Sequence, residues 1–137
     1  MAKFEITEHT ADVGVRAFGA TREELFANAA LGMFSIIGDL ETVQPRETRE
    51  VCVRADDPEG LLAAFLGELL YLFDAERFVL HDAAVKSVSD CEVCATLRGE
   101  PIALHHDLRT EIKAVTHHNL KVEKRGDAWH ATVLFDI

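Results

Sequence analysis

The sequence DPEGLLAAFLGELLYLF, residues 57–73, carries the strongest structural signal in the chain. Asp57 is a favourable N-cap residue and Pro58 fits the first turn, so we expect a helix to begin here. Apolar residues then recur at helical spacing and form a broad apolar face. They are Leu61, Leu62, Phe65, Leu66, Leu69, Leu70 and Phe73. A face this broad needs nearly complete burial, which predicts that the helix packs against a sheet.

A second helix is predicted upstream. Thr21-Arg22-Glu23-Glu24 forms a capping box, in which the Thr21 hydroxyl and the Glu24 carboxylate can satisfy free backbone N–H groups. Apolar residues again follow at helical spacing, and Gly38 is a natural place for the helix to end. These apolar residues are Leu25, Phe26, Ala29, Met33 and Ile36 or Ile37.

The rest of the chain alternates apolar and polar residues, which is typical of strands. The strands predicted before the helix at residues 57–73 are Phe4–Ile6, Val13–Gly19 and Thr48–Arg54; those after it are Arg77–Leu80, Ala83–Ser89, Glu92–Arg98, Thr110–Thr116, Leu120–Lys124 and Trp129–Asp136. Strands and helices alternate in the first part of the chain, and only strands are predicted after residue 76. This order predicts an α+β fold, with two helices packed on a mostly antiparallel sheet in a single domain over residues 1–137.

Composition limits the partners. The 137 residues carry a formal net charge of −10, from 24 acidic and 14 basic side chains. Such a chain repels phosphate at long range, so we expect no direct, stable binding of nucleic acid; a basic protein or a cation is a better partner. No apolar run approaches the ~20 residues of a membrane span, and residues 1–6 do not resemble a signal peptide. We therefore expect a cytoplasmic protein.

The three cysteines are Cys52, Cys91 and Cys94. Their odd number argues against a disulfide framework. Cys91 and Cys94 form a C-x-x-C pair, but the surrounding pattern is that of a strand, which points residues three apart to opposite faces. We interpret them as ordinary strand cysteines rather than a redox or zinc site.

The C-terminus offers a candidate cation site. The sequence stops at Ile137, directly after an apolar strand, so the terminal carboxylate is expected beside the Asp136 carboxylate. Two negative charges this close repel unless a cation or a basic group lies between them. Calcium and magnesium prefer clusters of oxygen ligands of this kind. The alternative is a solvated strand end.

Two further residues are candidates on weaker signals. Asp12 lies between two short strands, where a turn residue that accepts backbone N–H bonds is the ordinary interpretation. Lys113, in a predicted strand, could balance an acidic cluster or hold a phosphate, and the alternative is a surface lysine. The spacing alone does not bring Asp12 to Asp136.

Histidine pairs occur at His105-His106 and at His117-His118. Neighbouring residues on a strand point apart, so neither pair is expected to bind one ion with both rings. The chain has no H-E-x-x-H motif. A metal hydrolase that uses His105 or His117 remains an alternative function.

Four segments resemble the archease family. Glu8–Gly19 resembles its N-terminal signature, Glu68–Asp74 is similar to its second helix, and Glu111–His118 resembles a late strand. The last segment, Val133–Ile137, ends in the Asp-Ile pair that is usual for the family. The likeness runs in order over essentially the whole chain, and the first and last motifs are the specific ones.

This resemblance implies a function. Archeases assist the RtcB-type RNA ligase, which attaches GMP to its own histidine before it joins RNA ends. The archease promotes this guanylylation and multiple turnover and broadens nucleotide use, without being the ligase. The family's metal site falls here on Asp12, Asp136 and the Ile137 carboxylate, with Lys113 at a functional position. Calcium is the expected ion, and magnesium or manganese also suit oxygen ligands. A chaperone-like module without a metal is a further alternative.

Overall fold

The computed structural model describes residues 2–8 and 12–137 and has an α+β fold, as expected. The elements are β1 (Phe4–Glu8), β2 (Asp12–Gly19), α1 (Arg22–Ile37), the 3₁₀ turn η1 (Leu40–Thr42), β3 (Glu47–Arg54), α2 (Pro58–Glu76), β4 (Phe78–Val88), β5 (Glu92–Pro101), β6 (Ala114–Arg125) and β7 (Ala128–Asp136). The strands form two antiparallel sheets rather than one: a four-stranded sheet in the order β1-β2-β7-β6 and a three-stranded sheet in the order β3-β5-β4.

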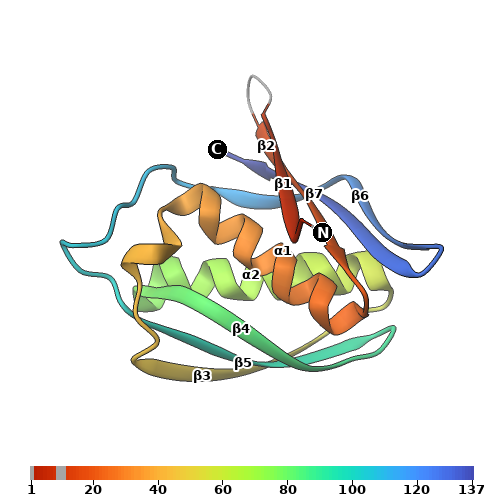
Figure 1. The fold of residues 1–137 in the computed structure, drawn as a ribbon, viewed down its shortest axis with the longest axis horizontal. Helices are drawn as coiled ribbons and strands as arrows, with labels where there is room; N and C mark the ends of the chain where they lie inside the picture. Colours follow the sequence, from red (N-terminus) through yellow and green to blue (C-terminus); the bar gives the residue numbers. More distant parts are fainter. Residues whose placement is uncertain (1, 9–11) are drawn as a thin grey trace.

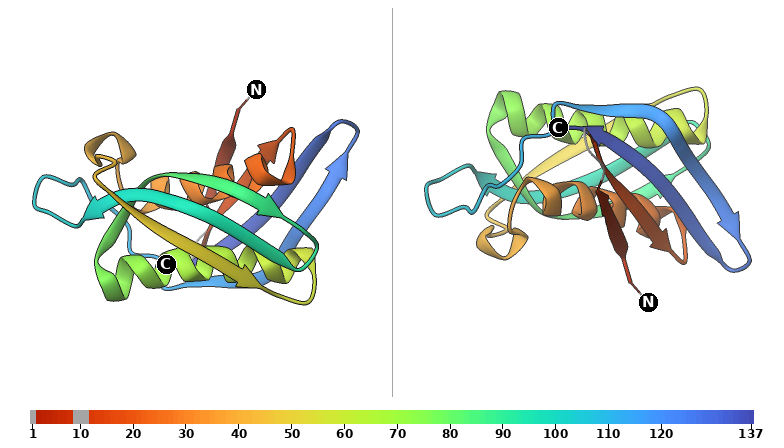
Figure 2. Two further views of the ribbon diagram at one scale, coloured as in Figure 1. Left: turned by 90° about the horizontal axis from the view of Figure 1, so that it is seen from below. Right: turned by 90° about the horizontal axis from the view of Figure 1, so that it is seen from above.

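The two helices lie between the two sheets (Figure 1), and Figure 2 shows the same layers from below and above. Helix α1 contacts β2 on one side and β4 on the other, while α2 contacts β6 and β3. The predicted apolar faces supply the core, where Leu25, Phe26, Leu61, Phe65 and Leu66 are fully buried. Each helix carries a broad apolar surface, and the two sheets pack against it from opposite sides.

Both predicted helix starts are confirmed. The Thr21 hydroxyl accepts a hydrogen bond from the Glu24 backbone N–H at 3.1 Å, and the Asp57 carboxylate accepts one from the Gly60 N–H at 2.6 Å. The first helix ends at the Gly38 C-cap. Among the described residues, neither helix combines the length and the apolar character needed to cross a membrane.

Two pairs of predicted strands join into single longer strands. Segments 77–80 and 83–89 belong to one strand, β4, which continues through irregularities between Leu80 and Asp82 and between Val85 and Ser87. Segments 110–116 and 120–124 likewise join in β6, which starts only at Ala114 and shifts register between Thr116 and Lys121. A bulge lets a strand continue past a polar residue that reads as a turn in the sequence.

The prediction for the cysteines was wrong in one respect. The antiparallel register of β3 and β5 places Cys52 opposite Cys94, with the Cα atoms 4.1 Å apart, and the two form a disulfide. Cys91 is free and exposed. An odd number of cysteines means that at least one is unpaired, but it does not exclude a single disulfide. The strand register that brings Cys52 to Cys94 cannot be read from a local sequence pattern.

Candidate metal site at the acidic end of the four-stranded sheet

Asp12 and Asp136 are direct partners in the register of β2 and β7. Residues opposite one another on antiparallel strands share a face, with their Cα atoms about 4.5–5.5 Å apart. Ile137 follows directly after Asp136. The fold therefore brings the three residues predicted for the cation site to one end of the sheet, although Asp12 and Asp136 lie near opposite ends of the sequence.

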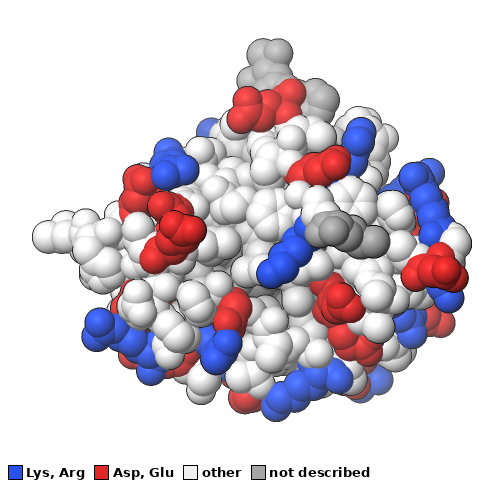
Figure 3. Space-filling view, in the orientation of Figure 1, with Lys and Arg blue, Asp and Glu red and all other residues white. Residues whose placement is uncertain are grey.

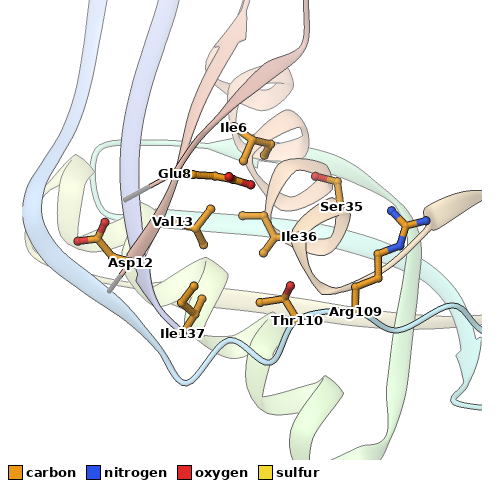
Figure 4. A pocket seen from close by; sticks show the side chains of 9 residues that line it. All are labelled: Ile6, Glu8, Asp12, Val13, Ser35, Ile36, Arg109, Thr110 and Ile137. Atoms are coloured by element: carbon orange, nitrogen blue, oxygen red, sulfur yellow. The ribbon is translucent and has the colours of Figure 1, made fainter. Parts of the chain in front are cut away.

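Asp12 and Ile137 also line a hollow of about 530 Å³ between this sheet end and α1. Its floor includes the apolar side chains of Val13 and Ile36. Figure 4 shows Asp12 and Ile137 at one end of the hollow, Arg109 at the other, and Glu8 reaching in from β1. Figure 3 shows acidic side chains gathered where β1 ends and β2 begins.

One oxygen of Asp12 has an unusual environment. Its Oδ1 is buried and has no hydrogen-bond partner among the described residues, whereas Asp136 is exposed. A buried carboxylate oxygen without a partner is costly, and a bound cation removes that cost. The donor set of carboxylate oxygens suits a hard divalent ion such as calcium. By its chemistry, the site fits the metal that the resemblance implies.

Arg109 does not neutralise this acidic end. Its guanidinium donates to Asp107 Oδ2 at 2.8 and 3.1 Å and lies 4.0 Å from Asp39, so other carboxylates already balance its charge. The hydrogen bond and charge of Asp107 raise the pKa of Arg109. Within residues 2–8 and 12–137, no lysine or arginine forms an ion pair with Asp12, Asp136 or Glu8. The excess of negative charge here is available to a cation.

Lys113 lies beside the site, but its link is through the backbone. Its N–H donates to the Asp136 carbonyl at 2.8 Å, and the next residue, Ala114, is the register partner of Asp136. The Lys113 side chain is exposed. Its main chain therefore holds the end of β7 in place. Its ammonium group lies at the surface, where a partner could contact it. Of the family-like N-terminal segment, residues 9–11 lie outside the described residues.

A second group of ligand-type side chains was not predicted. Nε2 of His106 lies 2.8 Å and Nε2 of His105 lies 3.5 Å from Oε2 of Glu100, and these atoms are close enough together to hold a metal ion. His105 and His106 occupy a turn, so the expectation that strand geometry separates them was wrong. Glu100, at the end of β5, carries no sequence signal that would link it to them. His117 and His118 lie exposed in β6 and belong to no such group among the described residues.

The hydrogen bonds of this second group favour a proton over a metal. His106 Nδ1 accepts the Ala103 backbone N–H at 2.9 Å, so a neutral ring carries its proton on Nε2 and donates it to Glu100. A metal on Nε2 would displace that proton, and a metal-bound histidine ordinarily donates through its other nitrogen. With a metal on Nε2, the ring proton of His106 would lie on Nδ1. That N–H would then point at the Ala103 N–H, and two donors cannot form a hydrogen bond.

Glu100 is already satisfied by the protein. Its carboxylate accepts the Gln44 N–H at 2.8 Å and pairs with Arg46 at 3.2 Å. The Gln44 hydrogen bond, followed by that of His106, lowers the pKa of Glu100 from 4.5 to about 2. We therefore assign this buried group to anchoring residues 102–110, and the acidic sheet end is the better candidate for a functional cation site.

The fold and the site define a class: a small α+β protein with two helices between two antiparallel sheets and a carboxylate pair where β2 and β7 meet. The model of the archease protein family (MTH1598/TM1083) matches residues 4–137, and the chain belongs to this family. It is 42% identical to the protein archease of Methanosarcina acetivorans, over 98% of this chain and 96% of that one. Identity is also 42% with the protein archease of Thermococcus gammatolerans, over the full length of both.

Two solved structures share this fold. Protein 1598 of Methanobacterium thermoautotrophicum matches with a TM-score of 0.85 and 34% identity, covering all of both chains. An archease of Thermotoga maritima, described as a possible chaperone, matches with a TM-score of 0.63 over 96% of this chain and 94% of that one. At 24% identity, the second likeness shows the fold alone.

Proposed function

We propose that this protein is an accessory activator of an RtcB-type RNA ligase and acts through a divalent cation held by Asp12, Asp136 and the Ile137 carboxylate. The observation that supports the proposal most directly is the register of β2 and β7, which pairs Asp12 with Asp136. The buried Asp12 Oδ1, which has no hydrogen-bond partner among residues 2–8 and 12–137, adds to this support. Calcium is the expected ion, with magnesium or manganese as the other oxygen-preferring choices.

The acidic end suits an active site that handles a triphosphate. A divalent cation supplies positive charge that lowers the barrier to phosphoryl transfer. Asp12 and Asp136 would orient that cation at the tip of the sheet, and the net charge of −10 would attract the protein to a basic RNA-binding cleft. The protein would thereby promote guanylylation, multiple turnover and broader nucleotide use in the cytoplasm, as one domain and without turnover of its own.

Lys113 has a supporting role in this proposal. Its backbone stabilises the Asp136 strand end, and its exposed side chain would contact a phosphate or an acidic group of the ligase. A Lys113→Met variant keeps the backbone bond and much of the side-chain length while it removes the charge. We expect weaker stimulation with unchanged cation binding.

The decisive experiment is a guanylylation assay of the ligase with and without this protein. Asp12→Asn, Asp136→Asn and an extension after Ile137 should each remove stimulation and leave the circular dichroism spectrum unchanged. Asp127→Asn is the matched control, because Asp127 is an exposed acid in the β6–β7 turn. Normal stimulation by all three site variants would overturn the proposal. Full stimulation after chelation would favour a chaperone-like module instead.

A further inference from the structure

We propose that the outer face of the four-stranded sheet binds single-stranded RNA, a role that rests on the proposed function and extends it to the ligase's substrate. The surface, here called the cationic sheet face, includes Arg16, Phe18, Lys121, Arg125, His130 and Thr132, which line a hollow of about 510 Å³ together with Glu5, Glu123 and Ala131. Figure 2, right, views this sheet from its outer side. The net charge of the whole chain argued against binding of nucleic acid. A net charge does not give the distribution of charge over the surface, so one face can still carry a local positive excess.

The strand register places these side chains together. Arg16 pairs with Thr132, which pairs in turn with Lys121. In the next row Phe18 pairs with His130. The alternate residues Ala17, Val122 and Ala131 are buried in the core, so the rows of the cationic sheet face point outward.

The charges of this face are only partly neutralised. Arg125 contacts Glu123 through Nε at 2.8 Å and Nη2 at 2.5 Å, so its charge is balanced. Arg16 lies 4.0 Å from Glu5, a distance that leaves its guanidinium donors available. Lys121 is exposed and forms no ion pair within the described part of the chain. The hollow is lined by three cations and by two carboxylates, Glu5 and Glu123, so it keeps a local excess of one positive charge in a chain whose net charge is −10. This excess, centred on Lys121, is the local site for phosphate groups.

An aromatic pair distinguishes nucleotides from other anions. The rings of Phe18 and His130 meet edge to face, with centroids 5.1 Å apart and planes at 88°. Single-stranded nucleic acids bind where bases can stack on aromatic rings beside cations that hold the backbone. An acidic peptide would use the cations and gain little from the rings, so this combination favours RNA.

The face also lies in line with the acidic end. Asp12 and Arg16 are on the same strand and the same face, four residues apart, which corresponds to about 13 Å. A stacked strand has one phosphate per ~3.4 Å, so an RNA end held near Asp12 would reach Arg16 within about four nucleotides and Lys121, two strands across the sheet, within about five. The two ends of one sheet face would thus serve the metal and the RNA respectively.

RNA ligation separates this role from activation, because guanylylation of the ligase involves no RNA. We expect Lys121→Ala and Arg16→Ala each to raise the KM for RNA in ligation about fivefold and to reduce its salt dependence, with guanylylation unchanged. Lys124→Ala is the matched control: it removes the same charge from the same strand, but Lys124 pairs with Trp129 in the row that faces the other way. Phe18→Leu, which keeps an apolar side chain, should raise the KM to a similar extent.

Two outcomes would overturn the inference. If neither Lys121→Ala nor Arg16→Ala changes the KM for RNA, these side chains do not contact the phosphates and the inference fails. Impaired guanylylation by Lys121→Ala without RNA assigns the face to the ligase protein instead. If the unaltered protein does not stimulate guanylylation, the proposed function fails, and photo-crosslinking of the protein alone to a 4-thiouridine-labelled oligouridylate decides this inference. Crosslinks at Phe18 or His130 support it, and crosslinks elsewhere or none refute it.

Discussion

The acidic sheet end and the Glu100–His106 group both gather side chains that metals prefer, yet they differ in how their polar atoms are satisfied. Every polar atom of the His106 ring has a partner, and Glu100 accepts hydrogen bonds from Gln44 and His106 and pairs with Arg46. Asp12 has a buried oxygen without a partner among the described residues. A closed network stabilises a fold, whereas an open one indicates a ligand.

The largest effect should come from removing a carboxylate at the acidic end. Asp12→Asn keeps the shape of the side chain and removes the charge, so calcium affinity should fall by at least about a hundredfold, as for loss of a direct ligand. Stability should change little, because the substitution also relieves repulsion from Asp136. Isothermal titration calorimetry measures the first effect and urea unfolding the second. A hundredfold loss of calcium affinity in the control Asp127→Asn would show that the effect is not specific to the acidic sheet end.

The Glu100–His106 group should show the reverse pattern. His106→Ala leaves Glu100 and the Ala103 N–H without a partner and should lower the free energy of unfolding by about 2 kcal/mol. Calcium affinity should be unchanged. His105→Ala is the control, because its ring is half exposed and lies 3.5 Å from Glu100. Equal destabilisation by both variants, measured in urea, would contradict the anchoring role of His106.

A smaller effect concerns pH. The pKa of Glu100 is lowered from 4.5 to about 2, mainly by the Gln44 hydrogen bond, so the folded state prefers the ionised form. This contribution is fully present above pH 4.5 and is lost as the pH falls from 4.5 towards 2. The stability difference between the unaltered chain and Glu100→Gln should therefore shrink over this range. A difference that grows on acidification would show that the sign is wrong.

The smallest expected effect is that of zinc on the Glu100–His106 group. Because His106 donates its Nε2 proton and cannot donate from Nδ1, added zinc should raise the Tm no further in the unaltered chain than in His105→Ala. A thermal shift that disappears on replacing His105 would make this group a metal site after all. Calcium tested in parallel should stabilise the unaltered chain and not Asp12→Asn.

Local patterns in the sequence were enough to predict the helices and strands. Thr21, Asp57 and Gly38 marked the helix ends, and the apolar faces identified the residues that the sheets would bury, because caps and periodicity act within a few residues. It also named Asp12, Asp136 and Ile137 as candidates, but the link between them came from a resemblance rather than from spacing.

Tertiary structure decided everything that depends on register. It divided the strands into two sheets, paired Cys52 with Cys94, set Asp12 opposite Asp136 and brought His105 and His106 to Glu100. It also gathered Arg16 and Lys121 on one face of a strongly acidic chain. Register follows from the packing of distant segments onto a shared core, so no local pattern records which residues will face one another.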